Sequence, residues 1–341
     1  MNKLLRTILL MGMAILSSLY IFADERDEFC DICYNEDYDK RFYSEGMRFM
    51  EVSSTTCKVD DLDRKYSGSL TIPANVFFKG RKLSVIAIGS ISGCLNLTAV
   101  NIPQSVRFIC DGAFEECENL LSVNIPSSVT SIGRSAFYRC YNLTSINIPS
   151  SVTKLGHGAF NMCKKLTSVT LSSSLTTIEN GTFRGCALTS IDIPSSVTTI
   201  EEEAFAGCRF TAIEIPPSVT SIGWRAFAGC ALTSIDIPPS VTSIGSEAFA
   251  NCRNLTSASI PASTQILGPS ENLIENIYLL FDRCEKLKFV KYGDSLISLE
   301  NRHEKLPQQE VNDSWEVHPE IDRIVDYNQV EPDSVAPSVP W

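Results

Sequence analysis

The fold of this chain is decided by one stretch, CYNLTSINIPSSVTKLGHGAF, at residues 140–160. Variants of it return every 22 or 23 residues across most of the 341-residue sequence. A period of this length is typical of a solenoid, in which a single repeat cannot bury its apolar side chains without its neighbours. The sequence therefore predicts a stack of near-identical coils.

Two residue types mark the period. Cysteine and phenylalanine each take one fixed position of the repeat, among apolar or small neighbours. Free cysteine behaves as a small hydrophobic residue and is often fully buried, so we expect both sets to line the interior as an unbonded core ladder. Its members are Cys94, Cys117, Cys140, Cys163, Cys186, Cys208, Cys230, Cys252 and Cys284, with Phe114, Phe137, Phe160, Phe183, Phe205, Phe227, Phe249 and Phe281.

The other positions of the repeat predict its local structure. Leucine and isoleucine alternate with polar residues up to Pro149, as in a short half-buried strand that proline ends. A second short apolar segment follows at 152–155, and Gly156 is expected to supply a turn with positive φ. The Ala-Phe-x-x-Cys segment fits one helical or 3₁₀ turn that points its phenylalanine and cysteine inward.

Composition divides the chain into five parts. Positive residues precede an uncharged apolar run at 8–22, which is the pattern of a secretory signal peptide, so 1–23 is predicted to be cleaved near Ala23. The alternative is that this segment stays uncleaved as an N-terminal anchor. The sequence has no second apolar run, so we expect no further transmembrane segment. The remaining parts are an N-terminal β cap at 24–68, the solenoid at 69–261, a degenerate last repeat with a C-terminal cap at 262–300, and an acidic, disordered tail at 301–341.

Four cysteines lie outside the ladder: Cys30, Cys33, Cys57 and Cys110. In an exported protein, a disulfide among the first three would staple the N-terminal cap. Idle thiols are the alternative. A redox or metal role for the Cys-x-x-Cys motif is a further one, although no second pair follows at zinc spacing. The sequence alone leaves the disulfide state of these four cysteines open.

The repeat resembles a known family. Its ladders, and the Ile-Pro-Ser-Ser-Val-Thr phrase at 125–130, 148–153 and 193–198, are similar to the BspA-like, or Treponema pallidum-type, leucine-rich repeats of bacterial surface and secreted proteins. The resemblance implies a β-rich leucine-rich-repeat solenoid, right-handed, with parallel short strands and helical or 3₁₀ turns. It also implies a secreted or cell-surface location, with the periplasm as the alternative, and a role in adhesion or binding.

Charge and motifs exclude several classes of function. The formal net charge is −11, but residues 66–300 hold 18 acidic and 17 basic residues, so the repeats offer no basic face for nucleic acid. The three histidines, His157, His303 and His318, belong to no catalytic or metal motif, and His157 is expected in an exposed turn. Serine is plentiful but has no positioned base. We therefore predict a non-enzymatic protein without a cofactor.

One outward column of side chains is the candidate binding site. Stacked strands lie about 4.8 Å apart, so equivalent residues of successive coils form columns. This column runs through Asn147, Thr170, Asp192, Glu214 and Asp236. Three adjacent carboxylates repel one another unless a cation or a basic group lies among them. The last three residues therefore predict a site for Ca²⁺ or for a lysine- and arginine-rich partner, with an ordinary solvated face as the alternative.

Trp224 is the one large aromatic residue of the repeats that we expect at the surface, where tryptophan often marks a binding hot spot. Packing against a neighbouring coil is the alternative. Together these observations favour an exported, adhesin-like binding module that engages a protein or glycan through the solenoid surface. A periplasmic or cell-surface structural scaffold without a host ligand is the second hypothesis. The sequence pattern does not specify the ligand, the mode of anchoring or the oligomeric state.

Overall fold

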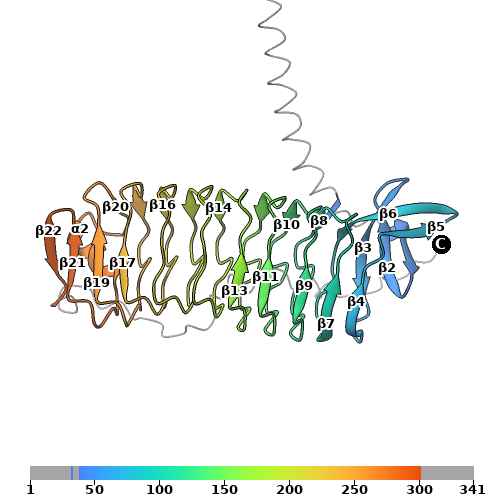
Figure 1. Ribbon diagram of the computed structural model, residues 1–341, viewed down its shortest axis with the longest axis horizontal. Coiled ribbons are helices and arrows are strands. Elements are labelled where there is room, and N and C mark those ends of the chain that lie inside the picture. Colours follow the sequence, from blue (N-terminus) through green and yellow to red (C-terminus); the bar gives the residue numbers. More distant parts are fainter. Residues whose placement is uncertain (1–31, 34–37, 301–341) are drawn as a thin grey trace, which may run out of the picture. The chain divides into compact units, whose positions relative to one another are not determined.

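The computed structural model describes residues 32–33 and 38–300. Residues 38–300 form a stack of coils, and Figure 1 shows the strands of successive coils side by side along it. The predicted signal peptide at 1–23 and the predicted tail at 301–341 lie outside the described residues. No helix of the described part is long and apolar enough to span a membrane.

The N-terminal end of the stack is covered by antiparallel strands. Strand β2 pairs with β1 on one side and with β3 on the other, and β3 then pairs in parallel with β6, the first strand of the coils. A hairpin of β5 and β6 follows. The elements are η1 (Tyr38–Lys40), β1 (Arg41–Ser44), β2 (Met47–Glu51), β3 (Thr56–Leu62), β5 (Asn75–Phe78) and β6 (Arg81–Ile88).

Strands that precede the proline of each repeat form one side of the stack, which we call the first wall. They pair in parallel within three separate groups, which hold three, two and three strands in chain order, and the antiparallel strand β22 closes the last group at the C-terminal end. The strands are β4 (Ser67–Thr71), β7 (Asn96–Asn101), β9 (Ser122–Asn124), β11 (Ser145–Asn147), β13 (Ser168–Thr170), β17 (Ser234–Asp236), β19 (Ser257–Ile260), β21 (Phe289–Tyr292) and β22 (Ser295–Ser298). The alternation of apolar and polar residues places isoleucine inward and polar side chains outward.

Two-residue strands from the second apolar segment form the other side, the second wall. They pair in parallel in two groups: β6 to β12, and β14 to β20. Between β12 and β14 the described strands make no pairing. The strands are β8 (Phe108–Ile109), β10 (Ser131–Ile132), β12 (Lys154–Leu155), β14 (Thr177–Ile178), β15 (Thr199–Ile200), β16 (Ser221–Ile222), β18 (Ser243–Ile244) and β20 (Gln265–Ile266).

The Ala-Phe-x-x-Cys segments form tight turns. The amide of Cys140, for example, donates to the carbonyl of Phe137 at 3.2 Å, which is an i→i+3 bond of the 3₁₀ type. The turn does not extend into a helix because residues on both sides of it are left-handed, with φ of 50° at Ser135 and 57° at Arg139. Helix α2 (Leu273–Leu280) lies in the insertion that follows Cys252, and the Asn272 side chain caps its N-terminus.

The prediction that Gly156 supplies a positive φ is wrong. Positive φ occurs at Gly158, with a value of 61°, and not at Gly156. Gly156 instead allows close stacking, because a Cβ atom there would lie 2.5 Å from the backbone nitrogen of Arg134 in the preceding coil. Gly133, Gly223 and Gly245 approach the preceding backbone equally closely. We call this place in the repeat the glycine position.

The core ladder lies inside the stack. The rings of Phe114 to Phe281 stack face to face in one continuous series, with centroids of successive rings 5.1–5.8 Å apart. All nine ladder cysteines are free and buried. Their thiols donate to backbone carbonyls, as from Cys163 to the carbonyl of Phe137 at 3.1 Å. A buried polar group is tolerated when it is hydrogen-bonded, so the ladder keeps its thiols without disulfides.

A disulfide among Cys30, Cys33 and Cys57 was predicted, but Cys33 has a different partner from the one expected. Cys33 bonds to Cys110, 77 residues away, while Cys57 is free and buried, and Cys30 lies outside the described residues. Cys110 occupies the glycine position of its coil, directly after β8. Ile32 packs there with Ala87, Phe108 and Cys110. The bond therefore ties the N-terminal segment to the start of the second wall, a contact that sequence proximity does not indicate.

Candidate functional site

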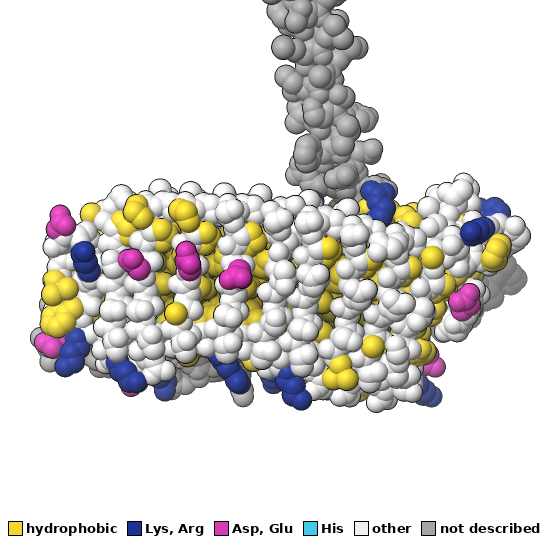
Figure 2. All heavy atoms as spheres, in the orientation of Figure 1, with side chains coloured by type: hydrophobic (Ala, Val, Ile, Leu, Met, Phe, Trp, Pro, Cys, Tyr) yellow, Lys and Arg dark blue, Asp and Glu magenta, His cyan; other side chains and the backbone are white. Residues whose placement is uncertain are grey.

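The predicted binding column lies on the outer surface of the first wall. All of its side chains from Asn147 to Asp236 are exposed. The register sets Asn147 beside Thr170, and Asp236 beside Ser259, which in turn faces Lys291. Figure 2 shows a row of acidic side chains along one half of the displayed face. The column thus changes from amide and hydroxyl groups to carboxylates and ends at a lysine.

The first wall is open in the middle of this column. Residues 190–192 and 212–214 occupy the places of two strands but form none. Ile191 and Ile213, which point inward there, are half-buried, whereas the equivalent Ile146 and Ile235 are each only 4% exposed. Carboxylates on neighbouring coils repel each other, and pairing resumes at β17, where Asp236 faces the neutral Ser259. The acidic part of the column therefore coincides with loosened backbone.

A hollow of about 630 Å³ adjoins the acidic part of the column. Its floor is apolar and includes isoleucine and proline from three successive coils, while its polar lining includes Glu214, Asp236 and Lys291. Among the described residues, Asp192, Glu214 and Asp236 make no ion pair. The apolar floor residues are Ile213, Ile215, Ile237, Pro238, Pro239, Ile260 and Pro261.

Trp224 does not belong to this surface. It is half-buried, and the guanidinium of Arg225 lies over its ring, 4.5 Å from the centroid. Its side chain is therefore less exposed than expected, and the contact with Arg225 is one within its own coil. The most exposed aromatic side chains of the described part are instead Tyr43 at 76% and Phe77 at 70%, on strands β1 and β5 of the N-terminal end. The repeat pattern gives no signal for them because they lie outside the regular coils.

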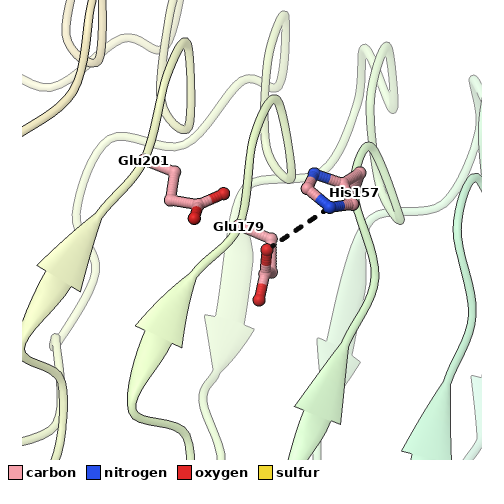
Figure 3. A group of neighbouring side chains, drawn as sticks. All are labelled: His157, Glu179 and Glu201. Carbon is pink, nitrogen blue, oxygen red and sulfur yellow. Dashed lines mark ion pairs between the residues drawn. The ribbon is translucent and has the colours of Figure 1, made fainter.

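A second cluster of functional groups lies just past the C-terminal ends of strands β12, β14 and β15 of the second wall (Figure 3). His157 follows Gly156, and Glu179 and Glu201 occupy the glycine position of the next two coils. The Nε2 atom of His157 lies 3.6 Å from an Oε2 atom of Glu179. One ligand atom from each of the three residues lies within 4.8 Å of the others. These side chains come from three successive coils and point toward one another.

The electrostatics of this cluster are set by its two carboxylates. Burial, and after it the negative charge of the neighbouring Glu201, raise the pKa of Glu179 to about 7, while Arg134 acts in the opposite direction. An Oε2 atom of Glu201 accepts a hydrogen bond from the backbone amide of Asn180 at 3.1 Å. This bond holds one oxygen of Glu201 in place.

Sequence reasoning placed His157 in an exposed turn, and its side chain is 45% exposed, but it did not connect this residue with the two glutamates. Within the described part of the chain, this is the one group of three histidine, cysteine or acidic side chains whose ligand atoms come this close. Asp192, Glu214 and Asp236 do not form another. Calcium binding by the column stays a prediction.

The fold and its ladders define a leucine-rich-repeat solenoid of parallel short strands, and they confirm the predicted fold class. The model of the BspA type leucine rich repeat region matches residues 84–209 and 176–303, with six copies. The chain therefore belongs to this family, as its resemblance indicated. No curated protein matches the chain.

Solved structures agree with this assignment. A leucine-rich repeat protein from Bacteroides ovatus is 32% identical in sequence to this chain. The match spans 74% of this chain and 71% of the Bacteroides chain, with a TM-score of 0.58. The leucine rich repeat protein of T. pallidum is 24% identical, covers 63% of this chain and 91% of its own, and has a TM-score of 0.50. The second similarity supports the fold alone.

Proposed function

We propose that the protein is an exported, non-enzymatic binding module, adhesin-like in its role, that engages a partner protein through the acidic part of the first wall. The single observation that carries this proposal is the row of carboxylates without ion pairs beside a hollow whose floor includes isoleucine and proline. The predicted signal peptide and the surface and secreted proteins that the repeat resembles support export to the cell surface or beyond.

The chemistry of the surface favours a basic protein segment as the partner. Asp192, Glu214 and Asp236 present three negative charges at strand spacing, and lysine or arginine side chains complement such a row. The isoleucine and proline floor of the hollow provides apolar contact next to it. Among the described residues that line the hollow there is no aromatic ring on which a sugar could stack. A protein is therefore a better fit than a glycan.

The proposal is tested with a charge-removing variant of the column: Asp192→Asn, Glu214→Gln and Asp236→Asn together. Immobilised wild-type protein and the variant are used to capture partners from host or community extracts, and the affinity of each captured partner is then measured at two salt concentrations. Three exposed ion pairs at about 0.2–1 kcal/mol each predict a loss of roughly threefold to 150-fold. The salt dependence of the remaining affinity should also decrease.

A matched control removes the same number of charges elsewhere. Asp39, Glu45 and Glu271 are exposed acids outside the column, and the variant Asp39→Asn, Glu45→Gln, Glu271→Gln should bind like the wild type. Equal losses in both variants would show that net charge, not this surface, determines binding. If no partner is retained in a column-dependent way, the structural scaffold becomes the better hypothesis.

A further inference from the structure

We propose that His157, Glu179 and Glu201 bind a divalent transition-metal ion of the Zn²⁺ class, and that the ion ties three successive coils together. This site is separate from the first wall and does not depend on the proposed partner binding. It is argued from the ligand set, from the place of each ligand in the repeat, and from a gap in the second wall.

The ligand set consists of one imidazole nitrogen and two carboxylates. Zn²⁺ binds both kinds of ligand at about 2.0–2.2 Å, which sets the ligand atoms of a tetrahedral site roughly 3.4 Å apart. The 3.6 Å between His157 and Glu179 is close to this separation. One carboxylate oxygen of Glu201 lies within 4.8 Å of the ligand atoms of both other residues. Since the three side chains are partly exposed, water can fill the remaining coordination position.

The two glutamates occupy the glycine position, and the coils directly before and after them have Gly156 and Gly223 there. A Cβ atom at Gly156 or Gly223 would meet the backbone of the preceding coil at 2.5 Å. Glu179 and Glu201 introduce that atom in two adjacent coils, together with two negative charges at close range. Packing and charge both act against this choice, so neither explains it. A bound cation explains it, because the ion requires both carboxylates and offsets their repulsion.

The position of the site coincides with the gap in the second wall. At the glycine position the amide usually donates to the preceding coil, as from Gly156 to Ile132 at 2.8 Å and from Glu201 to Ile178 at 2.9 Å. Among the described residues, no such backbone bond joins Glu179 to Leu155, and β12 does not pair with β14.

His157 follows the last strand before the gap, and Glu179 follows the first strand after it. A metal ion held by both would replace the missing backbone connection with a bridge between side chains. The ion would thus join the two groups of second-wall strands at the interruption between β12 and β14.

Neighbouring charges are compatible with a cation. Arg134 is the basic group that acts on Glu179, and Glu202 adds a further carboxylate, which accepts a hydrogen bond from the Asn180 side chain at 3.3 Å. The site therefore has three carboxylates and one imidazole around it, and only one guanidinium to balance the negative charge.

The test uses the full chain, stripped of metal, and titrates ZnCl₂ by calorimetry at pH 7.5. The wild type should bind one Zn²⁺ per chain at this site and melt at a higher temperature with the ion. His157→Gln should weaken binding by at least about tenfold, since it removes the single imidazole ligand. The double variant Glu179→Gly, Glu201→Gly should lose the site as well. Because glycine is the residue that other coils use at this position, that variant should fold in metal-free buffer.

Two controls separate this site from other ligands. The chain has only three histidines, so the variant His303→Gln, His318→Gln should bind Zn²⁺ like the wild type. Titration with Co²⁺ should give no sulfur-to-metal charge-transfer band, since the ladder thiols are buried. Hydrogen exchange of the amides at 153–157 and 176–180 should slow when Zn²⁺ binds, whereas the distant amides at 243–266 should not change.

The proposal is overturned if the wild type binds no Zn²⁺, or if binding survives both His157→Gln and the double glycine variant. Loss of binding on removal of His303 and His318 would assign the ion to the C-terminal residues instead. Ca²⁺ binding that depends on Asp192, Glu214 and Asp236, without Zn²⁺ binding at His157, would place the cation on the first wall and contradict this inference.

Discussion

Phe160 lies inside the series of stacked rings, where its replacement by alanine should strongly destabilise the protein. It is fully buried, and its ring lies 5.1 Å from that of Phe137 and 5.7 Å from that of Phe183. Phenylalanine-to-alanine changes in cores cost about 3–5 kcal/mol. Each ring pair adds about 0.5–1.5 kcal/mol beyond area burial, so Phe160→Ala should fall at the upper end of that range.

Two comparisons make this prediction specific. Phe114 is equally buried but stacks on Phe137 alone, so Phe114→Ala should cost about 1 kcal/mol less than Phe160→Ala. Phe289 is 44% exposed, and Phe289→Ala should cost less than about 1 kcal/mol. The free energy of unfolding is measured by urea denaturation followed by circular dichroism. The slope m must be compared between variants, because repeat arrays can lose two-state behaviour. A cost below about 2 kcal/mol for Phe160→Ala, or a larger cost for Phe114→Ala, would refute the stacked core.

Two further substitutions test other parts of the fold. Gly156→Ala should destabilise by about 1–3 kcal/mol in thermal or urea unfolding, because the new Cβ would meet backbone that cannot rotate away; unchanged stability would contradict the close stacking at the glycine position. Burial, and then the charge of Glu116, raise the pKa of Glu115 to about 7 from 4.5, against the opposing effect of Arg139. The folded state therefore binds this proton more tightly, and ionisation costs stability as pH rises from 4.5 to 7. Glu115→Gln should stabilise by on the order of 1 kcal/mol at pH 8, allowing for partial exposure, and should have little effect at pH 4. An effect of equal size at both pH values would contradict this assignment.

The repeat made most of the fold predictable. The fixed places of cysteine, phenylalanine and proline specify which side chains point inward and where each strand ends, and they do so locally, within one coil. The β-rich solenoid and its family follow from this pattern. The reason for Gly156 was not predictable in the same way, because the contact it allows is with Arg134 in another coil.

Long-range features escaped the pattern for the same physical reason. The disulfide partner of Cys33 is set by how the N-terminal segment folds over β8, not by its spacing to Cys30. His157, Glu179 and Glu201 are each about one repeat apart, and their convergence depends on stacking. A signal was nevertheless present, since two adjacent coils depart from glycine at the position where their neighbours keep it.

The opening of the first wall also has no counterpart in the repeat pattern. Residues 190–192 and 212–214 read like the other strands, with isoleucine after a small residue and before an acidic one. Whether such a segment pairs depends on the adjacent coils, so the missing strands appear only when the coils are stacked.

The central claim is that each of the near-identical coils buries one free thiol, and that only the outer surface of the stack is available to bind a partner. Thiol labelling with peptide mapping tests it most directly: a polar reagent is applied to the native protein and, separately, to protein unfolded in guanidinium chloride. Burial raises the pKa of the Cys117 thiol to about 12, and ladder thiols should stay unlabelled in the native state and react at all nine positions after unfolding. Rapid native labelling of ladder cysteines, or disulfides between them, would contradict the account.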